Sequence, residues 1–263
     1  MSATQAAARL SVVTPAYNEA DNLPALHARL VATTMVGEWI VVDDHSSDAT
    51  YAVLATLVRA DERVRGIRLA RRCGAHAAIM CGLMEARGDA VAVLAADLQD
   101  PPELLAPLAA QWGAGTPIVW AVRRRRVSDT WSAVVWSSVY HWLVRTIGGV
   151  RGVPAGGAGF FLIDRCVVEA LRSTDRRVTD VFALIGSLGY PYAVVTYDRS
   201  PRHRGTSRWT VRRKVGFAVQ SLLSLSPLAV LRASTRWSIE ARIGHVVDSA
   251  DAPSLADRGP ECR

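Results

Sequence analysis

The segment Asp89–Glu103, DAVAVLAADLQDPPE, is the most informative part of the chain. Its apolar run, which contains Val91, Val93 and Leu94, is β-prone and predicts a short strand that is buried on both faces. Polar residues from Asp97 to Asp100 end the run, and the two prolines that follow mark the start of a helix. Because ligands bind at the carboxyl ends of strands in open α/β sheets, the segment predicts a polar binding site. A solvated loop that only caps the helix is the alternative.

The rest of the first half repeats this pattern of buried strand, polar loop and helix. Apolar residues recur at helical spacing between the runs that we expect to form strands. Five strands that alternate with helices over roughly 120 residues predict a parallel, doubly wound sheet. Farther along, Asp164 and Arg165 are expected to close a strand and open a helix. The four strands predicted in addition to the one after Asp89 are Leu10–Thr14, Trp39–Val42, Val64–Leu69 and Ile118–Val122.

The loops after the first, second and fourth predicted strands are polar, and in a parallel sheet they share one edge. Their carboxylates suit the hydroxyl and amino donors of a ribose and a base, and hard oxygen ligands suit Mg²⁺ or Mn²⁺. A nucleotide-sugar therefore fits this edge well. Neither GxGxxG after the first strand nor GxxxxGK[ST] occurs, which argues against a dinucleotide-binding fold and a P-loop kinase. The edge carries Asn18, Glu19, Asp43, Asp44, Asp48, Asp97, Gln99 and Asp100.

The positive charge of the chain is concentrated in its second half. The net charge is +7, and between Arg199 and Ser238 there are nine basic residues and no acidic one. Two clusters stand out, at Arg123–Arg126 and at Arg199–Lys214, and arginine forks suit phosphates. The clusters therefore indicate a phosphate-bearing partner. Nucleic acid is not expected, because no recognised nucleic-acid module accompanies the charge.

The last third of the chain bears on whether the protein binds or crosses a membrane. No run of about 18 uncharged apolar residues occurs, so no transmembrane helix is predicted. The first ten residues lack the apolar core of a signal peptide, so we expect a cytoplasmic protein. Val211–Leu231 is apolar behind a basic opening, which is typical of an amphipathic helix on an anionic membrane surface. The expected protein is therefore either soluble or peripheral on the inner face of the membrane, with a partly disordered tail over 233–263.

Several motifs occur together in an order that resembles the inverting family 2 glycosyltransferases of GT-A fold. More narrowly, they are similar to the polyprenyl-phosphate, or dolichol-phosphate-type, glycosyltransferases, from about Leu10 to Leu231. The resemblance implies a GT-A domain over 1–232, with a nucleotide-sugar half at about 9–122 and an acceptor half at about 123–232. The motifs are VVTPAYNEADNL (12–23), IVVDDHSSDAT (40–50), RRCGAHAAIMCGLMEARGD (71–89), AADLQDPPE (95–103), AVRRRR (121–126), GGAGFFLIDR (156–165), PRHRGTSRW (201–209) and SLLSLSPLAVLR (221–232).

The resemblance also implies roles for individual residues. Asp97 matches the last acid of the metal-binding DxD motif, and Gln99 matches a further ligand of Mg²⁺ or Mn²⁺ and of the donor. Arg123 and Arg126 match arginines near the acceptor phosphate. Arg202, Ser207 and Arg208 match a segment that closes over donor and acceptor, so that Asp97, Arg202 and Arg208 would be catalytic and Ser207 would bind the donor. The pocket for the base and ribose of a UDP- or GDP-sugar would consist of Pro15, Tyr17, Asn18, Glu19, Asp44 and Asp48.

This sequence departs from the family pattern at two positions that bear on function. Ala95 stands where the first acid of DxD is usual, and Gly159 stands where an acid usually precedes Phe160. Three hypotheses follow. The chain transfers a sugar to polyprenyl phosphate by single displacement, it uses a soluble acceptor of specialised metabolism, or it is a nucleotide-sugar-binding homologue with weakened catalysis. Metal dependence, the identity of base and sugar, and homo-oligomer formation stay open.

Overall fold

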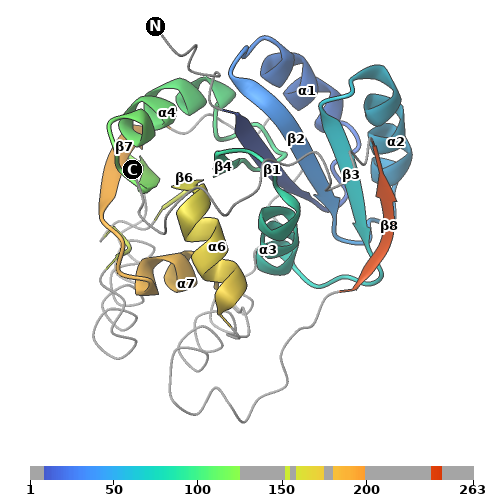
Figure 1. Ribbon diagram of the computed structural model, residues 1–263. Coiled ribbons are helices and arrows are strands. Elements are labelled where there is room, and N and C mark those ends of the chain that lie inside the picture. Colours follow the sequence, from blue (N-terminus) through green and yellow to red (C-terminus); the bar gives the residue numbers. More distant parts are fainter. Residues whose placement is uncertain (1–8, 125–151, 155–157, 175–179, 199–237, 245–263) are drawn as a thin grey trace, which may run out of the picture.

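The computed structural model describes residues 9–124, 152–154, 158–174, 180–198 and 238–244 (Figure 1). In these residues one eight-stranded sheet has the order β7-β5-β6-β4-β1-β2-β3-β8. The strands are β1 Leu10–Ala16, β2 Val36–Asp43, β3 Val64–Leu69, β4 Ala90–Val93, β5 Ile118–Arg123, β6 Phe160–Asp164, β7 Tyr192–Tyr197 and β8 Ile239–Ile243. The helices are α1 Leu23–Val31, α2 Thr50–Ala60, α3 Ala75–Glu85, the short 3₁₀ helix η1 Pro102–Leu104, α4 Leu105–Gly113, α6 Arg165–Ser173 and α7 Val181–Ser187.

The sheet is mostly parallel, as the sequence predicts. Strands β1 to β4 pair in parallel, and β5 pairs in parallel with β7. The antiparallel strand β6 lies between β4 and β5, so these two strands still point the same way. All five strands predicted in the first half are present, and Asp164 ends β6 and caps α6 through a bond from the Cys166 N–H. The α/β class and the GT-A-like arrangement are therefore confirmed.

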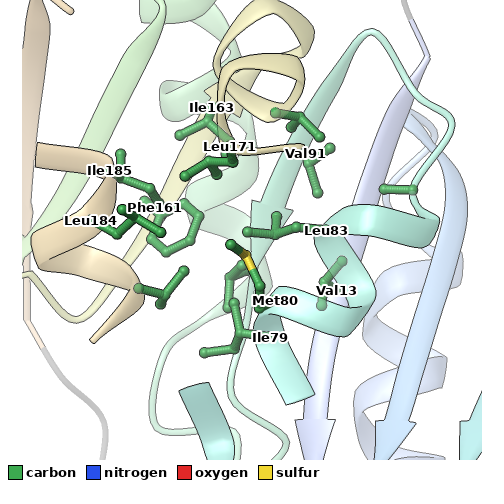
Figure 2. Packing of buried hydrophobic residues seen from close by; sticks show 14 of the residues in the cluster. Val13, Ile79, Met80, Leu83, Val91, Phe161, Ile163, Leu171, Leu184 and Ile185 are labelled. Carbon is green, nitrogen blue, oxygen red and sulfur yellow. The ribbon is translucent and has the colours of Figure 1, made fainter. Parts of the chain in front are cut away.

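Two apolar layers cover the faces of the sheet. Successive strand residues point to opposite faces, so Val13 packs with α3, α6 and α7, whereas its neighbour Val12 packs with α1, α2 and α4. Figure 2 shows the first layer, where Met80 and Leu83 of α3 meet Phe161 of β6 and Leu171 of α6. This double cover explains the continuous apolar runs of the central strands.

Helix α3 approaches β1 so closely that a glycine is needed at the contact. A Cβ atom added to Gly82 would lie 2.3 Å from Cγ1 of Val13. The small residues of this helix, which the sequence shows as a run of alanine and glycine, therefore set its distance from the sheet. The loop before α3 is thereby held at the edge where the functional residues gather.

The last described segment adds a strand that the sequence does not predict. Residues Ile239–Ile243 form β8, which pairs antiparallel with β3 and ends the sheet on that side (Figure 1). We predict this segment to be part of a partly disordered tail over 233–263, and for residues 239–243 the structure shows a paired strand instead. The sheet therefore extends beyond residue 232. The amphipathic helix expected at Val211–Leu231 lies outside the described residues. No helix within the described ranges is long and apolar enough to cross a membrane.

Candidate active site

Four loops meet at the carboxyl edge of the parallel strands. The sequence predicts this gathering for the loops after β1, β2 and β4, and the structure adds the loop after β3. Backbone hydrogen bonds connect the strand ends. The Asp44 N–H donates to the Ala16 carbonyl at 2.8 Å, and the Leu94 N–H donates to the Val13 carbonyl at 2.9 Å. The loops are therefore fixed to one another where the strands end.

The loops after β1 and β2 interlock through Asn18. Its N–H donates to Ser46 Oγ at 2.9 Å, and its side-chain Oδ1 accepts from the Ser47 N–H at 2.9 Å. Asn18 has a φ of +56°, a left-handed conformation that asparagine tolerates better than most residues. The next N–H, of Glu19, donates to Thr50 Oγ1 at 2.8 Å, and Asp48 Oδ1 accepts from the Thr50 N–H at 2.9 Å. Asn18 links the loops after β1 and β2, and Asp48 orders the start of α2.

Asp44 joins the loop after β2 to the loop after β3. Its two carboxylate oxygens accept from the N–H groups of Cys73 and Gly74, at 2.6 and 2.9 Å. Burial raises the pKa of Asp44, while these two bonds and the charge of Arg72 act in the opposite direction. The adjacent Asp43 is fully buried, and it accepts from Arg68 Nη1 at 2.9 Å and from the Ser46 N–H at 2.9 Å. These acids order the loops that frame the site.

Arg72 lies on the face of Tyr17. The guanidinium carbon is 3.9 Å from the centre of the tyrosine ring, a cation–π contact between the loops after β3 and β1. Arg72 is not among the predicted site residues, although the loop after β3 must lie at the same edge because β3 is parallel to β2. The parallel order of the strands would have been enough to include Arg72 among the candidate site residues.

The loop after β4 holds Asp97 and Asp100 in a tight turn. Asp97 is 7% exposed, and its Oδ1 accepts from the Gln99 N–H at 3.2 Å. Leu98 between them has a φ of +59°. Asp100 is 1% exposed and accepts from the hydroxyl of Tyr197 at 2.5 Å. Both carboxylates are therefore buried at the carboxyl edge, and Asp100 is bonded to the last residue of β7.

The resemblance implies a divalent metal, and the chemistry of this turn fits one. In the described part of the chain, no group of three or more His, Cys, Asp or Glu residues could hold a metal. Mg²⁺, however, normally takes only one or two protein carboxylates and completes its shell with water and substrate phosphates. Asp97, with Gln99 beside it, meets that lower requirement. The residues present therefore fit a metal that binds together with a diphosphate.

The predicted site residues fall into two groups. Arg123 ends β5 opposite Tyr197 in the register with β7, and so lies at the same edge as the donor-side residues. Arg126, Arg202, Ser207 and Arg208 lie outside the described residues. The structure brings together Pro15, Tyr17, Asn18, Glu19, Asp44, Asp48, Asp97, Gln99 and Arg123 at or beside the carboxyl edge.

Solved structures with the same fold include a mannosyltransferase from Pyrobaculum calidifontis, determined in complex with GDP-Man and Mn²⁺. The similarity has a TM-score of 0.58 at 19% sequence identity and covers 88% of this chain and 66% of that one. At this level of identity the likeness shows the fold alone.

Proteins related in sequence are more similar to this chain than that solved structure is. An uncharacterized glycosyltransferase of Synechocystis is 34% identical over 223 residues, which cover 83% of this chain and 70% of the relative. The undecaprenyl-phosphate 4-deoxy-4-formamido-L-arabinose transferase of Yersinia pestis is 30% identical over 238 residues, which cover 88% and 72%. The model of glycosyl transferase family 2 matches residues 11–165. With the α/β sheet and its carboxyl-edge site, these matches show that the chain belongs to glycosyltransferase family 2 and is a glycosyltransferase.

Proposed function

We propose that this glycosyltransferase moves a sugar from a UDP- or GDP-sugar to a polyprenyl-phosphate-type acceptor, with inversion at the anomeric carbon. The observation that carries the donor side is the joining of four loops at one edge, with Asp44 after β2 and Asp97 after β4, on either side of β1. The acceptor side is supported by relatives named as undecaprenyl-phosphate sugar transferases. In this reading the enzyme works at an anionic membrane surface.

The donor pocket would be formed by the loops after β1, β2 and β3. Arg72 lies on the ring of Tyr17, with its guanidinium carbon 3.9 Å from the ring centre, and a base would stack on this pair. Asp48 and Glu19 offer carboxylate oxygens of the kind that ribose hydroxyls donate to. Asp44 keeps the pocket in shape through the backbone of Cys73 and Gly74. This arrangement suits a nucleoside held flat against the edge of the sheet.

The diphosphate would lie toward the loop after β4. Asp97 and Gln99 would hold Mg²⁺ or Mn²⁺ there, and such an ion stabilises the charge that develops on a leaving diphosphate. Arg202 and Arg208 are proposed to contribute further positive charge to the same group. Because Asp97 is the one acid of the DxD position, we expect weak metal binding by the free protein and a clear gain with nucleotide.

The acceptor phosphate would lie beside Arg123 and Arg126. An oxygen of this phosphate attacks the anomeric carbon, the bond from that carbon to the diphosphate breaks, and the nucleoside diphosphate leaves with the bonding electrons. A phosphate monoester is largely ionised at pH 7, so its oxygen needs no general base. This chemistry agrees with a chain that has Gly159, rather than an acid, before Phe160.

Product analysis tests the proposal. Full-length protein is incubated with radiolabelled UDP- and GDP-sugars and Mn²⁺, with and without undecaprenyl phosphate. We expect label in the organic extract only when the lipid is present, and none with Asp97→Ala. Label on soluble products alone would refute the lipid acceptor. Absence of both transfer and thermal stabilisation by any nucleoside diphosphate would refute the donor assignment.

A paired substitution tests the metal assignment. Ala95→Asp restores a second carboxylate and should tighten Mn²⁺ binding in the presence of nucleotide, because an added ligand charge favours a divalent ion. Asp97→Ala should abolish that binding. Calorimetry of Mn²⁺ with and without nucleoside diphosphate gives the readout. Equal nucleotide affinity in excess chelator, together with no effect of Asp97→Ala, would mean that arginines alone neutralise the diphosphate.

A further inference from the structure

A hydrogen bond links the outer part of the sheet to the loop that carries Asp97. Tyr197, the last residue of β7, donates from its hydroxyl to Asp100 Oδ1 at 2.5 Å. The two residues are only 4% and 1% exposed. In the strand order, β5 and β6 lie between β7 and β4, so the bond passes over the ends of both strands. It therefore ties together segments that no strand pairing connects.

Gly159 provides the space for this hydroxyl. A Cβ atom at position 159 would lie 2.2 Å from the Tyr197 hydroxyl oxygen, a distance at which something must move. The next residue, Phe160, packs edge-on against the Tyr197 ring with centroids 5.6 Å apart, and this limits where the ring can go. Any side chain at position 159 would therefore push the hydroxyl away from Asp100. The space that a side chain at position 159 would enter, where the family pattern implies an acid, is filled here by the hydroxyl of Tyr197.

The turn from Asp97 to Asp100 needs support at both ends. Leu98 has the left-handed φ of +59°, which a branched apolar residue adopts only where its surroundings hold it. At the first end, Asp97 Oδ1 accepts from the Gln99 N–H. At the other end, Asp100 is held by Tyr197. One of the contacts that hold this turn is thus made from β7.

We propose that Tyr197 is a positioning residue for Asp97 and that Gly159 is part of the same device. By holding Asp100, Tyr197 fixes the turn and sets the place where Asp97 meets the metal and the diphosphate. This inference rests on the proposed function of the Asp97 loop. It also explains Gly159, because a glycine at this position leaves room for the hydrogen bond from Tyr197 to Asp100. The absence of an acid at position 159 is then no sign of lost catalysis.

The test measures Mn²⁺ affinity in full-length protein saturated with the UDP or GDP that wild type binds. Loss of a hydrogen bond to a buried carboxylate should weaken Mn²⁺ binding about tenfold in Tyr197→Phe. Gly159→Ala should have a similar effect, because it displaces the same hydroxyl. Nucleotide affinity in excess chelator should stay at the wild-type value in both variants, since the base pocket is untouched. Asp100→Asn retains an oxygen that accepts from Tyr197, and should stay close to wild type.

A double substitution sharpens the result. In Tyr197→Phe the atom nearest to a Cβ at position 159 becomes the ring carbon at 3.3 Å, which leaves space for a methyl group after a small shift. Gly159→Ala should therefore add little in the Tyr197→Phe background, although it weakens binding in the wild-type background. Two matched controls should behave as wild type: Tyr192→Phe, at an exposed site on the same strand, and Gly113→Ala, where a Cβ would meet nothing within 4 Å.

Hydrogen exchange gives a readout that needs no nucleotide. The segment 95–104 should exchange faster in Tyr197→Phe and in Gly159→Ala than in wild type, and an unchanged rate overturns the proposal. A lower thermal midpoint with unchanged Mn²⁺ affinity would make Tyr197 merely structural. A loss in Asp100→Asn as large as in Tyr197→Phe would make Asp100 itself a ligand, against the proposal. Failure of wild type to bind any nucleotide would refute the proposed function instead.

Discussion

Asp44 acts on the site through the backbone of a neighbouring loop. Both of its oxygens are engaged by the N–H groups of Cys73 and Gly74, and the next residue back along that loop is Arg72, which covers Tyr17. An acid that the resemblance places in the base and ribose pocket thus also determines where a cation lies in that pocket. Sequence alone could place Asp44 at the edge. It could not show this second effect, which depends on how the loop after β3 folds back.

A graded substitution at Asp44 measures this effect. Asp44→Ala removes both acceptors and should lower the free energy of unfolding by about 1–3 kcal/mol, partly offset by the relief of a buried charge. Asp44→Asn keeps one acceptor oxygen, so its free energy of unfolding should lie between those of Asp44→Ala and wild type. Nucleotide affinity should decline in the same order, as measured by calorimetry beside urea unfolding. Wild-type affinity in Asp44→Ala would show that the loop after β3 is ordered without it.

Helix α3 shows how closely packing controls the loops of the site. The close contact of Gly82 with Val13 sets the distance between this helix and β1. The first residue of the helix directly follows Cys73 and Gly74, whose N–H groups Asp44 binds. Apolar periodicity was sufficient to predict this helix and the five strands of the first half. It did not predict β7 and β8, because their short alternating patterns resemble ordinary surface segments until a partner strand is known. Tyr197, at the end of β7, was missed for that reason.

Gly82→Ala should destabilise the protein even though alanine is the better helix former. Alanine in a helix interior is favoured over glycine by about 1 kcal/mol. A methyl group 2.3 Å from Val13 Cγ1 has to be relieved by a shift of the whole helix, and such overpacking costs about 1–3 kcal/mol. Gly113→Ala in α4 meets open space and should be neutral or slightly stabilising. Urea midpoints compare the two. A stabilised Gly82→Ala would mean that α3 is free to move away from β1.

Two segments that are far apart in the chain meet where α3 contacts α7. His76, in the first turn of α3, accepts through Nδ1 from the Val181 N–H at 3.2 Å, and Asp180 Oδ1 lies 3.8 Å from the same nitrogen. Burial lowers the pKa of His76, and the charge of Asp180 opposes this shift only in part. The folded protein therefore favours a neutral imidazole at this contact. The sequence alone does not predict this coupling, because it links segments that are 105 residues apart.

The sign of the resulting pH dependence follows from the lowered pKa. In the unfolded chain His76 titrates near its ordinary pKa of about 6.5, so below that pH the unfolded state binds the proton more readily. Stability contributed by the neutral imidazole is present above about pH 6.5 and is lost as the pH falls. Thermal midpoints between pH 7.5 and 5.5 should therefore decline less in His76→Asn than in wild type. A steeper decline in the variant would mean that attraction to Asp180 outweighs burial.

The pairing of β8 with β3 has a consequence for how the protein is made. Glu240 accepts from Arg68 Nε at 3.1 Å, and these residues are 172 positions apart in the chain. While the ribosome is still producing the intervening residues, β3 has no neighbour on that side and presents free N–H and carbonyl groups. Unpaired strand edges of this kind promote association between chains. We therefore expect that chains that end before residue 239 aggregate, and that the nascent protein depends on chaperones until β8 emerges.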